Sequence, residues 1–75
     1  MKVYVDTYCD PTGGTRLNHR LSQQRAALVS AYLEDHGIAS DRLIARGFGA
    51  THFIARNETV DGRVQNRRIE LLLIE

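Results

Sequence analysis

The sequence predicts a two-layer fold of the α+β or α/β class, in which one long helix packs on three strands. Three segments have the alternation and the β-branched composition of strands, and one has the spacing of a helix. In chain order these are a strand over 2–8, a helix over 16–36, a strand over 42–48 and a strand over 69–74. Because a helix connects the first two strands, we expect them to be parallel, with a right-handed crossover. The 75 residues, 1–75, are expected to form a single domain.

The first strand and the turn after it have clear local signals. Val3 and Val5 alternate with aromatic and polar residues over 2–8, KVYVDTY. The segment 10–14, DPTGG, predicts a turn, because proline fixes one backbone torsion angle and glycine permits left-handed ones. The chain is therefore expected to leave the sheet through a tight turn before the helix begins.

The helix over 16–36 has an apolar stripe that we expect to face the sheet. Asn18 is placed to cap or precede the first turn, and Gly37 is a favourable C-terminal stop. The stripe consists of Leu17, Leu21, Leu28 and Tyr32, widened by Val29 and Leu33.

Arg25 interrupts the edge of this stripe. It stands four residues after Leu21 and four before Val29, so it lies on or beside the face that should be buried. The common explanation is that the long stem carries the charge out to water. The alternative is that the charge is held in place for a ligand. The helix pattern alone leaves both interpretations open.

The remainder of the chain contains two short strands and a long loop. The segment 42–48, RLIARGF, has Leu43 and Ala45 on one face. The fourteen residues 49–62 are polar and without clear periodicity, and loops of that length are usually functional or mobile. The C-terminal strand is strongly apolar on at least one face, so a single helix leaves part of the sheet bare. We expect a second helix or a partner chain to cover it.

Composition excludes some classes of protein and leaves others open. The formal net charge is +1, with nine arginines, one lysine and nine acidic residues. The planar guanidinium of arginine suits carboxylates and phosphates better than the ammonium of lysine does. A GC-rich coding sequence would explain the excess of arginine over lysine equally well. The sequence has no run of eighteen apolar residues and no apolar signal segment, so we expect no direct membrane insertion by this segment.

We expect neither catalysis nor a bound metal or cofactor. Cys9, Asp10 and His19 can be written as a nucleophile, an orienting acid and a base, but Cys9 is better interpreted as a small half-buried side chain at a strand end. The histidines are scattered, and no cysteine–histidine cluster has zinc-ligand spacing. Nucleic-acid binding needs a basic stripe with aromatic residues able to stack, whereas acidic residues are interspersed here.

Three motifs, in this order, carry a resemblance to a known family. They are N-x-x-L-S-x-x-R-A at 18–26, G-F-G at 47–49 and N-x-T-x-x-G-R-x-x-N-R-R at 57–68, and the turn CDPTGG precedes them. Together they resemble the OmpA-like C-terminal domain, the family of OmpA, the peptidoglycan-associated lipoprotein and MotB. The resemblance covers residues 5–72. It implies an α+β fold with a mixed sheet backed by helices, of which this chain lacks the family's first strand and first helix.

The resemblance also implies a function. Domains of this family hold the cell wall without covalent bonds, by gripping the meso-diaminopimelate of the peptidoglycan stem peptide. The chain is then expected to anchor an envelope protein in the periplasm of a Gram-negative cell, in association with the outer membrane. The family's aspartate falls on Asp10 and its arginine on Arg25. Further ligand-binding positions implied by the resemblance are Thr12, Asn18 and Arg67.

The free end of diaminopimelate carries an ammonium and a carboxylate on one carbon. We expect Asp10 to accept hydrogen bonds from the ammonium and Arg25 to donate two parallel ones to the carboxylate. In the empty site, Asp10 and Arg25 are expected to pair with each other. Arg63 and Arg68 are expected to have structural roles.

Two departures from the family pattern support an alternative function. Thr7-Tyr8-Cys9 stands where the family usually has G-H-T, and Phe53 stands where proline is common. The alternative is a dimerisation or assembly module of an envelope or flagellar motor protein that has lost wall binding. Its partner would be a second copy of this chain, giving a homodimer.

Overall fold

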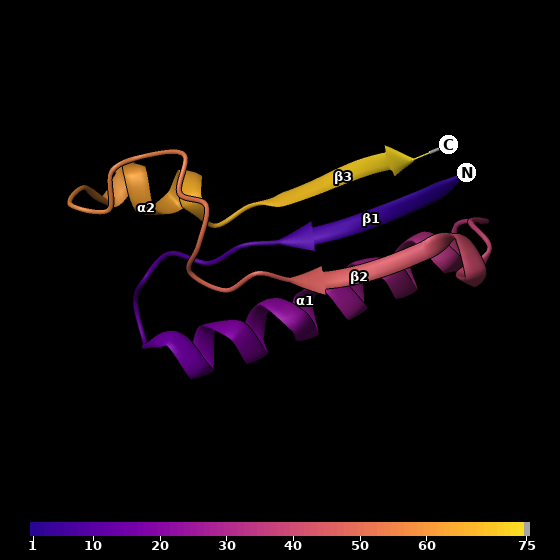
Figure 1. Ribbon diagram of the computed structural model, residues 1–75, viewed down its shortest axis with the longest axis horizontal. Coiled ribbons are helices and arrows are strands. Elements are labelled where there is room, and N and C mark those ends of the chain that lie inside the picture. The colour runs from indigo at the N-terminus through magenta and orange to yellow at the C-terminus, as the bar shows by residue number, and fades with distance from the viewer. Residues whose placement is uncertain (75) are drawn as a thin grey trace.

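The computed structural model describes residues 1–74 of the chain (Figure 1). The predicted order of strand, helix, strand and strand is confirmed, and each predicted end lies within one residue of the observed one. The elements are β1 (Lys2–Thr7), α1 (Thr15–Asp35), a 3₁₀ turn (Ser40–Arg42), β2 (Leu43–Gly47), α2 (Val60–Asn66) and β3 (Ile69–Ile74).

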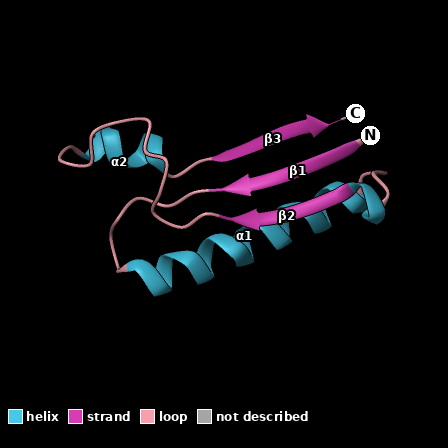
Figure 2. Ribbon diagram, in the orientation of Figure 1, coloured by secondary structure: helices cyan, strands magenta, loops and turns pink. Residues whose placement is uncertain are grey.

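The three strands form one mixed sheet in the order β2-β1-β3 (Figure 2). β1 is parallel to β2, with Val5 opposite Ala45, and antiparallel to β3, with Val5 opposite Leu71. The parallel pair is the one that α1 connects, as expected. α1 packs along β2 and β1, whereas α2 lies beyond the end of the sheet where β3 begins (Figure 1).

The buried contacts of α1 are made by small side chains, so the prediction that its apolar stripe faces the sheet is wrong for Leu17, Leu28 and Tyr32. The other members of the stripe, Leu21, Val29 and Leu33, are half-buried. The buried residues of α1 are Asn18, Ser22 and Ala26, which recur every four residues along one face. Leu28 and Tyr32, by contrast, are 71% and 60% exposed. Where α1 passes Gly47, its sheet-facing surface is too close to the strands to hold large side chains.

α1 approaches the sheet very closely at Gly47 in β2. A Cβ atom added to Gly47 would lie 2.6 Å from Gln23 Cα and from the backbone carbonyl carbon of Ser22. The side chain of Gln23 holds this contact, since it accepts from the Gly47 N–H at 2.9 Å and donates to the Ala45 carbonyl at 3.3 Å. On β1, the Thr7 hydroxyl donates to the Ser22 carbonyl. The backbones of strand and helix therefore pack almost directly on each other.

α2 begins inside the segment 49–62, which the sequence predicted to be a loop, so that prediction is wrong for its last part. Thr59 caps the helix, and its hydroxyl accepts from the Gly62 N–H at 2.9 Å. The helix has only seven residues, and its two valines, Val60 and Val64, are both exposed. No apolar face therefore marks this helix in the sequence, and the capping threonine is its one local signal.

The face of the sheet opposite α1 carries a cluster of aromatic and charged side chains. Arg46 donates two hydrogen bonds of 2.7 Å to the Asp6 carboxylate, and its guanidinium lies 3.7 Å from the centre of the Tyr4 ring. Farther along the same face, the rings of Tyr8 and Phe48 stack with centroids 5.1 Å apart. These contacts bury Asp6 and Tyr8 on a face that carries no helix.

β3 is covered by neither helix. All of its residues, Ile69–Ile74, are exposed, including those that point to the side of the sheet on which α1 lies. β3 is an edge strand, and its outer edge has no partner strand within residues 1–74 (Figure 1). The expectation that a single helix leaves part of the sheet bare is therefore confirmed.

Candidate functional site

The candidate site lies where the chain leaves β1 and turns toward α1. Asp10 is buried in this turn, and its Oδ1 accepts a hydrogen bond from the Thr12 backbone N–H at 2.8 Å. The hydrogen bonds from Thr12 hold the pKa of Asp10 below its ordinary value of 3.8, and the charges of Arg67 and Arg63 act in the same direction against the effect of burial. Asp10 is therefore an ionised carboxylate at neutral pH.

The lowered pKa of Asp10 links its charge to stability. A carboxyl group whose pKa is lower in the folded than in the unfolded chain stabilises the fold above the unfolded value, here close to 3.8. This stabilisation is lost as the pH falls through the folded-state pKa. The turn is therefore held by the ionised carboxylate throughout the neutral range.

Asn18 ties the turn to α1 and is not the helix cap. The residue that precedes α1 is Gly14, which supplies no side-chain cap, and Asn18 lies buried in the first turn. Its side-chain Nδ2 donates to the Asp10 backbone carbonyl at 3.2 Å, and the Asn18 backbone carbonyl accepts from Cys9 Sγ at 3.4 Å. Cys9 is buried rather than half-buried, and burial raises the pKa of its thiol. These contacts fix the backbone that carries the Asp10 carboxylate.

Arg67 is the ion-pair partner of Asp10. Its Nε lies 3.0 Å from Asp10 Oδ2. The side chain of Arg67 is 48% exposed, whereas that of Asp10 is 8% exposed. The expected pair of Asp10 with Arg25 is therefore wrong. This prediction failed because the sequence did not predict α2. Arg67 follows the last residue of α2, and this position brings it to Asp10.

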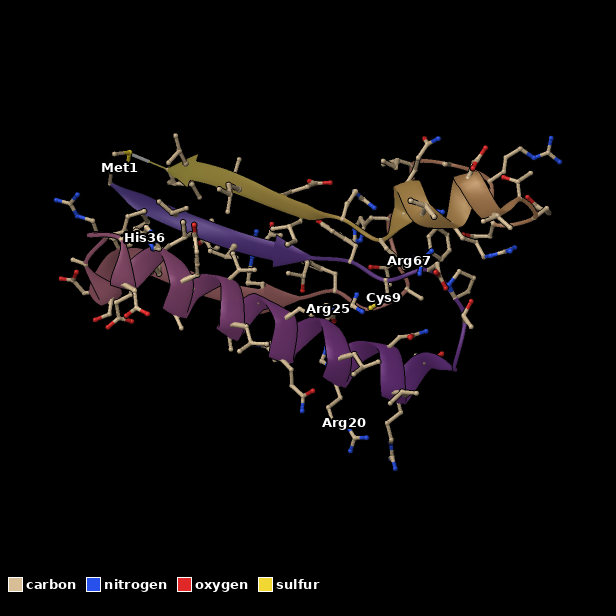
Figure 3. The ribbon with its side chains drawn as sticks, turned by 180° about the vertical axis from the view of Figure 1, so that it is seen from behind. Met1, Cys9, Arg20, Arg25, His36 and Arg67 are labelled. Carbon is tan, nitrogen blue, oxygen red and sulfur yellow. The ribbon has the colours of Figure 1, made fainter. Side chains whose placement is uncertain are left out.

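Arg25 lies on the flank of α1 and faces a small cavity. Its side chain is exposed rather than partly buried, and it makes no ion pair or side-chain hydrogen bond with residues 1–74. Figure 3 shows Arg25, Cys9 and Arg67 toward the same end of the molecule, with Arg25 on α1 and Arg67 beside α2. The cavity has a volume of about 230 Å³ and is lined by Thr7, Tyr8, Arg25, Arg67, Arg68 and Ile69.

Arg68 forms another wall of this cavity and is held firmly in place. Its guanidinium lies 4.0 Å from the centre of the Tyr8 ring. It also donates to a Glu70 carboxylate oxygen at 2.6 Å and to the His52 carbonyl at 2.7 Å. Because Arg68 is engaged by these partners, its contacts agree with the expected structural role.

Asn66 shapes the site, although the sequence assigned it no role of its own. It is fully buried, accepts from the Ile54 N–H at 2.7 Å and donates to Asn57 Oδ1 at 2.7 Å. Arg63 donates to the carbonyl of the same Asn57 at 2.8 Å. These residues of the N-x-T-x-x-G-R-x-x-N-R-R motif bind the loop to α2, and they fix the point from which Arg67 extends. Their place in the motif was the only sequence signal for them.

The carboxylate and the arginines of this site suit a ligand that carries both a positive and a negative charge. A fixed carboxylate, Asp10, lies beside Arg67, and Arg25 faces the same cavity from α1. Such groups accept hydrogen bonds from an ammonium and donate them to a carboxylate. Within residues 1–74, no three His, Cys, Asp or Glu side chains are grouped as metal ligands would be. Neither helix in that range combines the length and the apolar character needed to cross a bilayer.

The chain belongs to the OmpA family, which its residues 1–67 match. The family resemblance inferred from the motifs is therefore confirmed.

Individual relatives match nearly the whole chain. It is 46% identical over 71 residues to the probable lipoprotein YiaD of Escherichia coli strain K12, covering 95% of this chain and 32% of that protein. It is 40% identical over 72 residues to the peptidoglycan-binding protein ArfA of Mycobacterium tuberculosis strain H37Rv, covering 96% of this chain and 22% of that protein. The chain thus spans a third or less of the length of these two relatives.

A solved structure confirms the α+β fold. The C-terminal domain of Helicobacter pylori MotB matches with a TM-score of 0.88 at 27% sequence identity, covering 95% of this chain and 55% of that one. The mixed sheet with its long helix is therefore the arrangement of a domain from the same family, and this chain spans about half of that domain's length.

Proposed function

We propose that this chain binds peptidoglycan non-covalently, through the meso-diaminopimelate of the stem peptide, and that it anchors an envelope protein to the cell wall. Membership of the OmpA family and the similarity to a protein named as peptidoglycan-binding support the wall as the target. The observation that supports diaminopimelate as the ligand is the buried Asp10 carboxylate beside a cavity lined by three arginines. In this proposal the chain is a binding module without catalysis, placed in the periplasm and associated with the outer membrane.

The proposed ligand fits this charge arrangement in one orientation. Its ammonium donates to the Asp10 carboxylate, and the carboxylate on the same carbon accepts from Arg25. Thr12 and Asn18 hold Asp10 in place through the contacts described above, and Arg67 stands next to the same carboxylate. A lysine at the same position of a stem peptide keeps the ammonium and lacks that carboxylate, so it is a matched comparison ligand.

An NMR titration tests this function. The isotope-labelled chain is titrated with a stem peptide that contains meso-diaminopimelate and, separately, with the same peptide containing lysine. We expect shifts at Asp10, Asn18 and Arg25 with the first peptide. The lysine peptide should bind at least about tenfold more weakly, because it leaves Arg25 without a partner. Equal affinities, or no shifts with either peptide, would contradict the proposed ligand.

The uncovered strand β3 favours a second candidate function, assembly with a second copy of this chain. We propose that two copies pair their β3 strands antiparallel about a two-fold axis. The strand, IELLLI, contains no proline and has apolar side chains on both faces, with Leu73 64% exposed. Its outer edge has no partner strand within the described chain. Two such edges are self-complementary, and joining them extends one sheet through both copies.

Light scattering after size-exclusion chromatography tests the assembly. We expect the wild-type chain to have the mass of two copies and the Leu73→Lys variant to have the mass of one, because a lysine on an edge strand opposes strand pairing. Val60→Lys, at an exposed position of α2, is the matched control and should remain dimeric. A wild-type chain with the mass of one copy at every concentration would exclude this pairing.

A further inference from the structure

Arg67 connects Asp10 to the cavity. Of the described residues, Arg67 lines the cavity and Asp10 does not, although the two side chains form an ion pair. Arg25 faces the same cavity from α1. A ligand that enters the cavity therefore meets three guanidinium groups, those of Arg25, Arg67 and Arg68, whereas the Asp10 carboxylate does not line the cavity.

The Asp10 carboxylate uses one oxygen for the turn and the other for Arg67. Oδ1 accepts from the Thr12 N–H at 2.8 Å, and Oδ2 lies 3.0 Å from Arg67 Nε. The backbone of Asp10 is fixed by the hydrogen bond from Asn18. Oδ2 is the oxygen that does not hold the turn, so we expect an incoming ammonium to take it, and Arg67 is the group that moves. Nearly half of the Arg67 side chain is in solvent, and the ammonium replaces its charge at the buried Asp10, so Arg67 can be displaced without leaving that carboxylate unpaired.

We propose that Arg67 is a displaceable counter-ion that makes the site selective for ligands carrying an ammonium and a carboxylate together. This inference rests on the proposed function and adds a selectivity role for Arg67. A zwitterionic end replaces Arg67 at Asp10 with its ammonium, and the released Arg67 turns to the carboxylate, which Arg25 also binds. A ligand with the ammonium alone leaves the displaced Arg67 beside a second cation and without an anion, and this repulsion opposes its binding.

Two variants of Arg67 and one control separate this role from a structural one. Arg67→Gln removes the charge, and Arg67→Lys keeps it. Arg42→Gln removes an exposed charge from the 3₁₀ turn that precedes β2, at the opposite end of the sheet from Asp10. Both side chains, Arg67 and Arg42, are substantially exposed, so each of the three variants is expected to fold, and circular dichroism verifies this.

Each variant is titrated with the diaminopimelate peptide and with the lysine peptide. For Arg67→Gln we expect the dissociation constant of the lysine peptide to fall and that of the diaminopimelate peptide to rise. The ratio of the two constants should therefore shrink about tenfold. Arg67→Lys and Arg42→Gln should keep that ratio within about threefold of the wild-type value.

The titration of Asp10 without any ligand is a second readout, which shows whether the charge of Arg67 acts on the Asp10 carboxylate as a counter-ion must. Carbon NMR of the Asp10 carboxyl should show a higher pKa in Arg67→Gln than in the wild type, because the nearby guanidinium stabilises the ionised form. The same pKa should be unchanged in Arg42→Gln.

Either of two results would overturn the inference. One is an Asp10 pKa that does not change in Arg67→Gln, and the other is a change of both dissociation constants by the same factor. Failure of the proposed function itself is recognised separately, because the wild-type chain then binds neither peptide, and the selectivity role of Arg67 is rejected with it.

Discussion

Gly47→Ala is expected to lower the free energy of unfolding by about 3 kcal/mol, because the interface between α1 and β2 has no space for a methyl group. The added Cβ would lie 2.6 Å from Gln23 Cα, which belongs to the backbone of a 21-residue helix and cannot turn aside as a side-chain end would. Relief requires α1 to move away from β2, which loosens packing along the helix. Urea denaturation followed by far-UV circular dichroism measures the loss.

Gln23→Ala is the matched control for this prediction. It removes the side chain that bonds the Gly47 N–H and the Ala45 carbonyl, but it adds no atom to the interface. We expect it to lower the free energy of unfolding by about 1 kcal/mol. If Gly47→Ala costs no more than Gln23→Ala, then α1 is not held against β2 as closely as described.

The strands and the long helix were predictable because their signals are local, whereas the buried face of α1 was not. Asn18, Ser22 and Ala26 are small, and two of them are polar, so the pattern assigned the sheet-facing side to the larger apolar residues instead. What the pattern lacks is the distance between helix and sheet. Gly47, on a different element, sets that distance, and it decides that only small side chains fit between the two layers.

The candidate site was predictable as a set of residues but not as a set of partners. The resemblance identified Asp10, Arg25 and Arg67, each within a recognisable motif. The ion pair of Asp10 with Arg67 joins residues far apart in the sequence, and it depends on α2 and on the buried hydrogen bonds of Asn66. No local pattern encodes such a contact, since tertiary structure determines which opposite charges meet. The roles of these residues in ligand binding stay predictions.

Asp10→Ala and Arg25→Ala are each expected to weaken binding of the diaminopimelate peptide at least about tenfold, which corresponds to about 1.4 kcal/mol or more. Each change leaves one charge of the bound zwitterion without its partner. Arg25→Ala is the cleaner test, because Arg25 makes no ion pair or side-chain hydrogen bond within residues 1–74 that the fold would lose. Asp10→Ala also removes the acceptor for Thr12 and Arg67, so its unfolding is measured alongside its binding.

Binding of the two peptides to these two variants shows which charge of the ligand each residue contacts. Arg25→Ala should weaken the diaminopimelate peptide and should not weaken the lysine peptide, because only the first offers Arg25 a carboxylate. Asp10→Ala should weaken both, because both carry the ammonium. Arg20→Ala, an exposed arginine on the same helix that does not line the cavity, should change neither. If Arg25→Ala weakens both peptides equally, Arg25 does not contact the carboxylate, and if it weakens neither, Arg25 has no part in the site.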